Sequence, residues 1–185
     1  MSENQRVRLS KQLLRQSLVK LLGEKNIHKI SVREICDLAQ VNRSTFYKYY
    51  GSQYDLFHDM ENEILEHVNT YLHDGPATTP GDLSQITNLM VFVAENAELC
   101  RIIINQNIDP QFPEALVNLP TLRQWIDTHF RPEYSKTEME YVYGLVVNGG
   151  FSVIRMWLNK DSPEPPDVIA QVLWSTIAKL FPAAI

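Results

Sequence analysis

The sequence predicts an all-α protein, and three of its features support this fold class. Apolar residues recur at spacings of three and four along most of the 185 residues, as they do on the buried face of a helix. Two S-x-x-E sequences, starting at Ser31 and Ser135, have the spacing of the capping box that begins a helix. No segment alternates apolar and polar residues as a half-buried strand does. We therefore expect helices joined by loops rich in proline and glycine.

The N-terminal part predicts two helices that enclose a small core. The first covers residues 6–23, and the second begins at Val32, directly after the first capping box. The isoleucines between these helices are expected to close the core together with Leu38 and Phe46. The leucines that share one face of the first helix are Leu14, Leu18, Leu21 and Leu22.

A third, short helix is expected from Arg43 to Tyr50. The Asn42 side chain can cap its first turn, and Gly51 suits the left-handed conformation in which many helices end. Phe46 and Tyr50 lie four residues apart and can share its buried face. The side chains left exposed are Arg43, Ser44, Thr45, Tyr47, Lys48 and Tyr49. Such side chains donate hydrogen bonds to phosphate oxygens and base edges, so the two helices form a helix-turn-helix pattern.

The sequence RSTFYKYYGSQYDLF at residues 43–57 resembles the DNA-binding signature of TetR/AcrR-family transcriptional regulators, and the likeness extends over about residues 7–72. It implies three N-terminal helices that include a recognition helix, a variable helical C-terminal domain, a homodimer and usually a small-molecule effector. The motif G-G-F-x-x-x-x-x-W-L at residues 149–158 is similar to the C-terminal domain of the subgroup that includes dihydroxyacetone-kinase-operon activators. We therefore expect a sequence-specific transcriptional regulator, a repressor, that binds a near-palindromic operator as a homodimer.

The helix-turn-helix residues divide into two kinds of expected DNA contact. Phosphate contacts are expected at Ser31, where backbone amides and the helix dipole favour an anion, and at Tyr47, Lys48, Ser52 and Tyr54. Base contacts are expected from Arg43, Ser44, Thr45 and Tyr49, and also from Arg33, which is alternatively an ordinary solvent-exposed helix residue.

Two residues depart from the family pattern. Gln40 stands in the turn between the helices, where glycine is frequent, and a positive φ there would strain it. Gln53 stands where lysine is usual. The missing charge should weaken phosphate binding and lower the slope of log affinity against log salt concentration by about one released ion.

The charges are divided unevenly along the chain. The net charge is −5, yet residues 1–60 contain ten Lys or Arg against six Asp or Glu. The remaining residues contain seven basic and sixteen acidic side chains. A basic N-terminal part on an acidic body is typical of a protein that contacts DNA at one end only.

The rest of the chain predicts six further helical segments. A helix of about 20 residues begins near Ser52, and a loop follows at residues 74–81. Asp82 is expected to cap the next helix. The remaining segments are a short helix from about residue 97, residues 114–130 with a break at Pro120, residues 136–159, and residues 166–180. We divide the chain into a helix-turn-helix DNA-binding domain (1–52) and a helical effector-binding and dimerisation domain (53–185).

The last two expected helices contain more apolar residues than so small a domain needs inside. We interpret them as the homodimer interface, a four-helix bundle across a twofold axis. Gly149 and Gly150 interrupt the first of them, at a cost of about 1 kcal/mol each relative to alanine. Close approach of another helix would compensate for that cost.

Polar and aromatic residues of the second domain are candidates to line an effector cavity. Each of them has ordinary core packing as the alternative. Asn148 is the most informative of them, because a buried amide in an apolar helix needs a partner, which a dimer interface could also supply. The candidates are Phe92, Trp125, His129, Tyr143, Asn148, Phe151 and Trp157. We expect a mostly apolar or amphipathic small molecule of unknown identity.

Other functional classes lack support in the sequence. No apolar run approaches the roughly 18 residues of a membrane span, and the N-terminus has no secretory signal, so we expect a cytoplasmic protein. The two cysteines form no metal-binding pair, and no nucleophile–base set or phosphate-binding glycine loop occurs, so we expect no enzyme, cofactor or metal. The alternative function is an all-α dimeric interaction module or co-regulator that has lost operator binding and responds to a partner protein.

Overall fold

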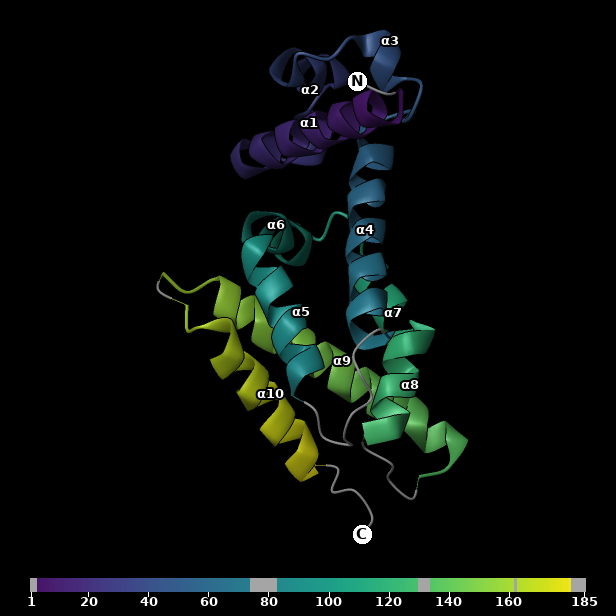
Figure 1. Cartoon of the computed structure of the whole chain (residues 1–185), viewed down its shortest axis with the longest axis vertical. Helices are drawn as coiled ribbons and strands as arrows, with labels where there is room; N and C mark the ends of the chain where they lie inside the picture. Colours follow the sequence, from purple (N-terminus) through teal and green to yellow (C-terminus); the bar gives the residue numbers. More distant parts are fainter. Residues whose placement is uncertain (1–2, 74–82, 130–133, 162, 181–185) are drawn as a thin grey trace. The chain divides into compact units, whose positions relative to one another are not determined.

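The computed structural model describes residues 3–73, 83–129, 134–161 and 163–180, and every regular element in these ranges is helical (Figure 1). The all-α fold class is therefore confirmed. In the order of the sequence, the elements are α1 (Glu3–Glu24), the short 3-10 helix η1 (Ile27–Lys29), α2 (Val32–Ala39), α3 (Arg43–Phe46), α4 (Gln53–His73), α5 (Ser84–Glu95), α6 (Ala97–Gln106), α7 (Phe112–Val117), α8 (Pro120–His129), α9 (Lys136–Leu158) and α10 (Pro166–Leu180).

The chain forms two compact units, and both contain part of α4. Unit 1 comprises Met1–Glu63 and Ile102–Asp109, and unit 2 comprises Ile64–Arg101 and Pro110–Ile185. The sequence-based division after residue 52 differs from this one in two respects. The first half of α4 packs with the N-terminal helices, and the end of α6 with the loop after it returns to unit 1.

Unit 1 has a small core of almost completely buried side chains. Helix α1 packs against α2, and α2 against α3. The side chain of Gln106 donates a hydrogen bond of 2.7 Å to the carbonyl oxygen of Leu22, which attaches the returning segment to the end of α1. The core side chains with at most 2% exposure are Leu14, Leu18, Leu22, Ile30, Ile35, Cys36, Phe46, Leu56, Phe57 and Met60.

Leu38 was expected in this core, and that expectation is wrong. Its exposed fraction is 42%. The capping box starts α2 at Val32, and from that start the helical period turns Ile35, Cys36 and Ala39 inward. Leu38 then lies about 110° away from the centre of that buried face, so it faces solvent.

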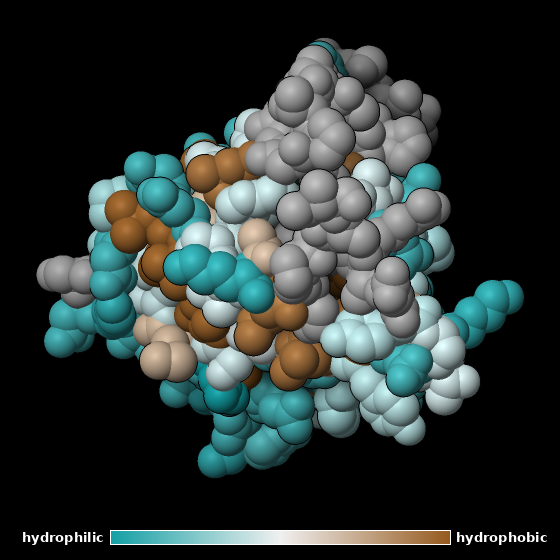
Figure 2. All heavy atoms as spheres, turned by 90° about the horizontal axis from the view of Figure 1, so that it is seen from below, coloured by the Kyte–Doolittle hydropathy of each residue, from teal (hydrophilic) through white to brown (hydrophobic). Residues whose placement is uncertain are grey.

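Unit 2 is built from packed helix pairs. Helix α10 packs against α5 and α9, and α7 packs against α8 and α9. The expected break at Pro120 is confirmed, because Pro120 is the first residue of α8, where its missing amide hydrogen costs little. The expected cap at Asp82 lies outside the described residues, and α5 begins at Ser84. Figure 2 shows hydrophobic side chains at the surface of the face drawn there, bordered by hydrophilic ones.

The second capping box begins α9. The Ser135 hydroxyl accepts from the Glu138 amide, and the Glu138 carboxylate accepts from the Ser135 amide at 2.7 Å. The Ser135 hydroxyl also donates to this carboxylate at 2.6 Å, and this hydrogen bond, followed by the one from the Ser135 amide, lowers the pKa of Glu138. In the described ranges, no helix is long and apolar enough to cross a membrane.

Candidate DNA-binding surface

The expected capping box at the start of α2 is present. The Glu34 amide donates to the Ser31 hydroxyl oxygen at 3.2 Å, and the Ser31 amide donates to the Glu34 carboxylate at 2.9 Å. Lys25 also donates to this carboxylate, at 2.5 Å. The hydrogen bond from Lys25, followed by those from Ser31, lowers the pKa of Glu34 to about 2. Glu34 is thus an anion at neutral pH, placed where the positive end of the α2 dipole stabilises it.

This capping box limits the hydrogen bonds that Ser31 can donate to a phosphate group. Its amide and its hydroxyl both donate to Glu34, at 2.9 and 2.8 Å. The amides of Val32 and Arg33 also belong to the first turn, where no intrahelical acceptor exists. A phosphate at this helix end would therefore bind those amides, or compete with Glu34 for Ser31.

The turn between α2 and α3 requires a left-handed residue, and that residue is Gln40. Its backbone has φ 54° and ψ 37°, so the strain expected from the missing glycine is present. The Asn42 side chain then caps α3 by accepting from the Ser44 amide at 2.9 Å, one residue earlier than the expected bond near Thr45.

Helix α3 is shorter than the sequence suggested. Only Arg43–Phe46 is α-helical, and residues 47–49 continue as a turn in which the Tyr49 amide donates to the Phe46 carbonyl oxygen. The expected left-handed end at Gly51 is also absent, since Gly51 has no positive φ. Its amide instead donates to Asp55 at 2.8 Å, and a Cβ at this position would lie only 2.9 Å from the same carboxylate oxygen. A larger residue here would therefore displace the Asp55 carboxylate, whereas the handedness of the backbone does not call for glycine.

The side chains that the sequence assigned to DNA reach the surface of unit 1. Tyr47 is 52% exposed, Tyr54 is exposed to 39%, and Lys48 is exposed. Arg33 lies in a loose surface ion pair with Asp37, at 3.5 Å, which leaves it free to turn toward DNA at little cost. The remaining candidates are exposed (Ser31, Arg43, Ser44) or partly exposed (Thr45, Tyr49, Ser52).

Two buried aromatic side chains fix this surface to the core. Phe46 is fully buried, and Tyr50 is 5% exposed, as their spacing predicted. The rings of Phe46 and Tyr50 lie 5.6 Å apart. Because these side chains come from the same turn as Tyr47, Lys48 and Tyr49, they determine which way the exposed residues point.

A charged network that sequence analysis did not predict holds Tyr50 in place. The Tyr50 hydroxyl donates to Asp59 of α4 at 2.6 Å, and Arg15 of α1 donates to the same carboxylate at 2.8 Å. Arg15 also pairs with Glu63 at 2.5 Å. Burial alone would raise the pKa of Asp59, but the hydrogen bonds from Tyr50 and Arg15 lower it overall. Arg15 and Asp59 are 44 residues apart, so no local spacing could reveal the pair.

Lys11 adds a second contact to the same turn. Its ammonium lies 5.8 Å from the ring centroid of Tyr49 and 5.3 Å from that of Tyr50, within range of a cation–π interaction. It also lies 3.9 Å from the Asp59 carboxylate. Helix α1 therefore contacts this turn through a basic side chain as well as through Arg15.

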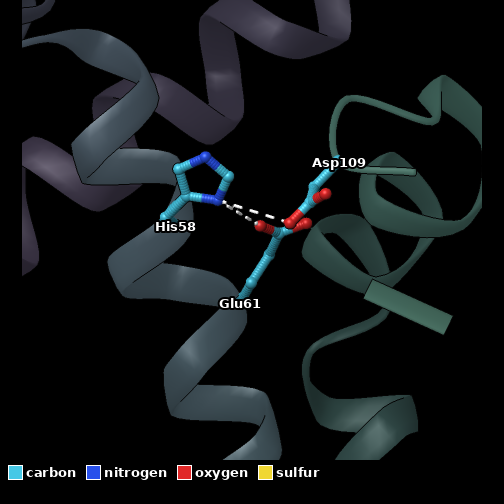
Figure 3. A group of neighbouring side chains, drawn as sticks. All are labelled: His58, Glu61 and Asp109. Atoms are coloured by element: carbon cyan, nitrogen blue, oxygen red, sulfur yellow. Dashed lines mark hydrogen bonds and ion pairs between the residues drawn. The ribbon is translucent and has the colours of Figure 1, made fainter. Parts of the chain in front are cut away.

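A second polar group of unit 1 lies away from this surface, between α4 and the segment after α6 (Figure 3). His58 Nδ1 is 2.9 Å from a Glu61 carboxylate oxygen and 3.6 Å from an Asp109 carboxylate oxygen. Glu61 is only 4% exposed. Burial, and then the nearby charge of Asp109, raise the pKa of Glu61 to about 7 against the opposing hydrogen bond with His58.

The candidate effector residues of unit 2 fall into separate hydrogen-bonded or aromatic groups. Phe92 packs on His67, with ring centroids 4.4 Å apart. Trp125 donates its indole hydrogen to Gln85 at 2.7 Å, and Trp157 donates to the carbonyl oxygen of Glu164 at 2.8 Å. All three candidates are buried, so each also has the core-packing role that was the alternative.

Tyr143 is the most polar of the buried candidates. Its hydroxyl donates to Asp127 at 2.7 Å, and the Arg123 guanidinium lies 4.6 Å from its ring centroid. Burial, and then the hydrogen bond to Asp127, raise the pKa of Tyr143 to about 12, so its hydroxyl is a donor at neutral pH. Arg123 is in turn paired with Glu140 at 2.8 Å.

One further candidate differs from expectation, one is partly exposed, and the side chain of one is not described. Asn148 is exposed rather than buried within its chain, and its amide donates to the Gly144 carbonyl oxygen at 2.8 Å. Phe151 is partly exposed. The side chain of His129 lies outside the described residues. Asn148 therefore does not line the interior of unit 2.

Sequence analysis did not identify Gln85, a buried polar residue of unit 2 whose side chain both donates and accepts a hydrogen bond. Gln85 is 8% exposed, and it joins Trp125 to the carbonyl oxygen of Leu72, which its amide reaches at 3.2 Å. Since Gln85 and Trp125 are 40 residues apart, only the folded structure brings them together.

The three N-terminal helices, the capped turn and the exposed basic and hydroxyl side chains define a helix-turn-helix protein of the class of transcriptional regulators. Family models support this class in both parts of the chain. Residues 16–60 match the model described as bacterial regulatory proteins, tetR family, and residues 83–179 match a TetR model described as transcriptional regulator C-terminal region. The chain belongs to the TetR family of bacterial transcriptional regulators.

Known relatives agree with this assignment. An uncharacterized HTH-type transcriptional regulator of Bacillus subtilis (strain 168), YxbF, is 22% identical over 184 aligned residues, which cover 90% of this chain. The chain spans only 44% of the length of YxbF.

Solved structures share the fold at low sequence identity. A TetR-family regulator from Syntrophomonas wolfei str. Goettingen superimposes with a TM-score of 0.72 at 15% identity, over 95% of this chain and 96% of that chain. The dihydroxyacetone kinase operon activator DhaS has a TM-score of 0.64 at 15% identity (93% and 96%). NalD, the secondary repressor of the MexAB-OprM multidrug efflux pump in Pseudomonas aeruginosa, has a TM-score of 0.57 at 16% identity (92% and 94%). An activator and a repressor thus share this fold.

Proposed function

We propose that this protein binds an operator as a homodimer and regulates transcription, with α3 and the turn after it in the DNA major groove. The observation that supports this proposal is the exposed surface of residues 43–49, fixed by buried Phe46 and Tyr50. A solvated helix face usually displays Glu, Lys and Gln, whereas this one displays tyrosine, hydroxyl and basic side chains. These are the groups that bind phosphates and base edges.

The roles within this surface follow from position. Arg43, Ser44, Thr45 and Tyr49 are the proposed base contacts, with Arg33 as a further candidate. An Arg paired with guanine would contribute roughly 1–3 kcal/mol of discrimination. The proposed phosphate contacts are Tyr47, Lys48, Ser52, Tyr54 and the first turn of α2 after Ser31.

The surface of α9 and α10 supports a homodimer through these helices. Large apolar side chains on both helices are exposed, and their separations of 4, 8 or 11 residues place them toward one side of each helix. Gly149 and Gly150 lie on α9, and among the described residues nothing lies within 4 Å of a Cβ added at either position. A helix from a second copy could approach there, which would offset the cost of two glycines inside a helix. The exposed apolar residues are Tyr141, Leu145, Met156, Val168, Val172 and Leu180.

Selection of bound sequences from a random DNA pool tests the proposal directly. We expect an inverted repeat, because two recognition surfaces related by a twofold axis bind two half-sites. Loss of selection, with a folded dimer present, would favour the alternative of an interaction module controlled by a partner protein.

Two variants then test the docking of the turn on DNA. Tyr47→Ala and Lys48→Ala should each weaken binding to the selected site and to unrelated DNA by about tenfold, since both lose phosphate contacts in two half-sites. Lys48→Ala should also lower the slope of log affinity against log salt concentration by about one per half-site. Electrophoretic shift at several salt concentrations measures both quantities.

Lys136→Ala, at an exposed lysine that begins α9, is the matched control. If either Tyr47→Ala or Lys48→Ala binds like the wild type, this docking is wrong.

We further propose that the regulator is a repressor. A mostly apolar small molecule would bind unit 2 and thereby change the affinity of the protein for DNA. The candidates to contact it are the buried residues Phe92, Trp125, Tyr143 and Trp157 and the partly exposed Phe151. Such an effector acts only if it binds one arrangement of the two DNA-binding units better than the other. Thermal-shift screening should find a stabilising compound, and Trp125→Phe should weaken its binding. Deletion of the gene should raise transcription from the selected operator.

A further inference from the structure

The three side chains of the group in Figure 3 have the donor atoms of a metal site. His58 and Glu61 lie three residues apart on α4, so both project from one side of the helix. Asp109 comes from the segment after α6. One donor atom from each of the three side chains, an imidazole nitrogen and two carboxylate oxygens, lies within 4.8 Å of the other two.

The distances already approach those of a ligand set around an ion. Neighbouring donor atoms at about 2.0–2.2 Å from a divalent transition-metal ion lie roughly 2.8–3.1 Å apart in octahedral geometry and roughly 3.3–3.6 Å apart in tetrahedral geometry. His58 Nδ1 is 2.9 Å from Glu61 and 3.6 Å from Asp109. A small rotation of these side chains would therefore suffice to surround an ion.

The burial of Glu61 provides a second, independent argument. Its side chain is only 5% exposed, yet its partners within this group are a histidine and a second carboxylate. A buried carboxylate beside a second carboxylate, here one that is 22% exposed, carries its negative charge at a cost in free energy unless a positive charge lies nearby. A divalent cation bound between them would remove this cost.

The third ligand is held in place without the ion. The bond from Gln106 to the Leu22 carbonyl oxygen, at 2.7 Å, attaches the segment before Asp109 to α1. The His58 side chain is half exposed, which leaves an entry path for an ion. The ligands are therefore positioned and accessible.

We propose that His58, Glu61 and Asp109 bind one first-row divalent transition-metal ion, with water in the remaining coordination positions. The imidazole favours Zn²⁺ or Fe²⁺ over Mg²⁺ and Ca²⁺, which prefer oxygen ligands throughout, and the two carboxylates also suit Mn²⁺. A bound ion would link α4 to the segment of residues 102–109, by which the chain enters unit 1 from unit 2 and leaves it again. It would therefore stabilise unit 1.

Calorimetric titration of the full chain, without an affinity tag and after removal of metal by chelation, tests this site. We expect one Zn²⁺ or Mn²⁺ ion per chain, with a dissociation constant in the micromolar range or below. A hundredfold excess over that constant should raise the thermal midpoint by about 5 °C. His58→Gln and Asp109→Asn should each weaken binding by at least about tenfold, as loss of one of three ligands requires. His28→Gln, at an exposed histidine outside the group, should bind like the wild type.

A second measurement guards against variants that do not fold. Co²⁺ bound to the wild type should give visible absorption bands distinct from those of the aqueous ion, and these bands should be absent from metal-free, folded Asp109→Asn. Three results would overturn the proposal: no saturable binding of Zn²⁺ or Mn²⁺, binding that both ligand variants retain, or an equal affinity for Mg²⁺. None of these measurements involves DNA, so they are independent of the proposed operator binding.

Discussion

Unit 1 and unit 2 use apolar surface in opposite ways. In unit 1, a core of nearly fully buried side chains is closed within the chain, and the large apolar side chains left outside are only 39–52% exposed; they are Leu9, Leu38, Tyr47 and Tyr54. In unit 2, aliphatic and thioether side chains such as Leu145 and Met156 remain 60–66% exposed on α9. The difference supports the proposal that a second copy of the chain covers the apolar face of unit 2.

The largest expected effect tests whether a second copy of the chain covers the exposed apolar face of unit 2. Leu145→Glu should leave the chain folded, because this side chain is exposed, but should place a charge in the proposed dimer interface. We expect a monomer by light scattering after size exclusion. We also expect at least a hundredfold loss of operator affinity, since the two half-sites no longer act together. Leu145→Met keeps an apolar side chain and should remain dimeric. A dimeric Leu145→Glu with normal affinity would show that α9 is not the interface.

The next effect tests whether the network of Arg15, Tyr50 and Asp59 stabilises unit 1. Asp59→Asn should destabilise it by roughly 1–3 kcal/mol, because Arg15 and Tyr50 lose the anion that both of them bind. Urea unfolding followed by circular dichroism measures the change. Glu63→Gln, which alters only the more exposed partner of Arg15, should cost less than about 1 kcal/mol. Equal effects of the two variants would mean that the partly buried network of Arg15, Tyr50 and Asp59 does not hold the turn after α3 in place.

A gain of stability should follow from relief of the strained turn. Gln40→Gly should stabilise unit 1 by about 1 kcal/mol or less, because glycine adopts φ 54° without strain but loses more conformational freedom on folding. Gln40→Ala keeps the Cβ and should show no such gain. Denaturant midpoints compare the three proteins. A loss of stability in Gln40→Gly would show that the Gln40 side chain makes a compensating contact.

The smallest effect concerns pH and the cap of α2. The pKa of Glu34 is about 2 in the folded chain and about 4.3 in an unfolded one, so Glu34 stabilises the fold above the unfolded value. This contribution should be lost as the pH falls from about 4.5 through 2. Glu34→Gln should therefore have a slightly lower urea midpoint than the wild type at pH 7, and the difference should vanish near pH 2. A difference that persists at pH 2 would have to come from the hydrogen bonds rather than from the charge.

The sequence by itself determined the local features of this protein. Both capping boxes, the break at Pro120 and the burial of Phe46 and Tyr50 occur as expected. Each of them depends on residues within one or two helical turns, where hydrogen bonds and the helical period act on neighbouring residues whatever the rest of the chain does. The family signature at residues 43–57 belongs to the same kind of local pattern.

Only the tertiary structure decided which distant residues meet. It pairs Arg15 with Asp59 and Gln85 with Trp125, at separations of 44 and 40 residues, and it brings Asp109 to His58. It also shortened α3. The physical reason is that such pairs depend on how all the helices pack together, and packing depends on shape and burial across the whole unit rather than on any spacing along the chain.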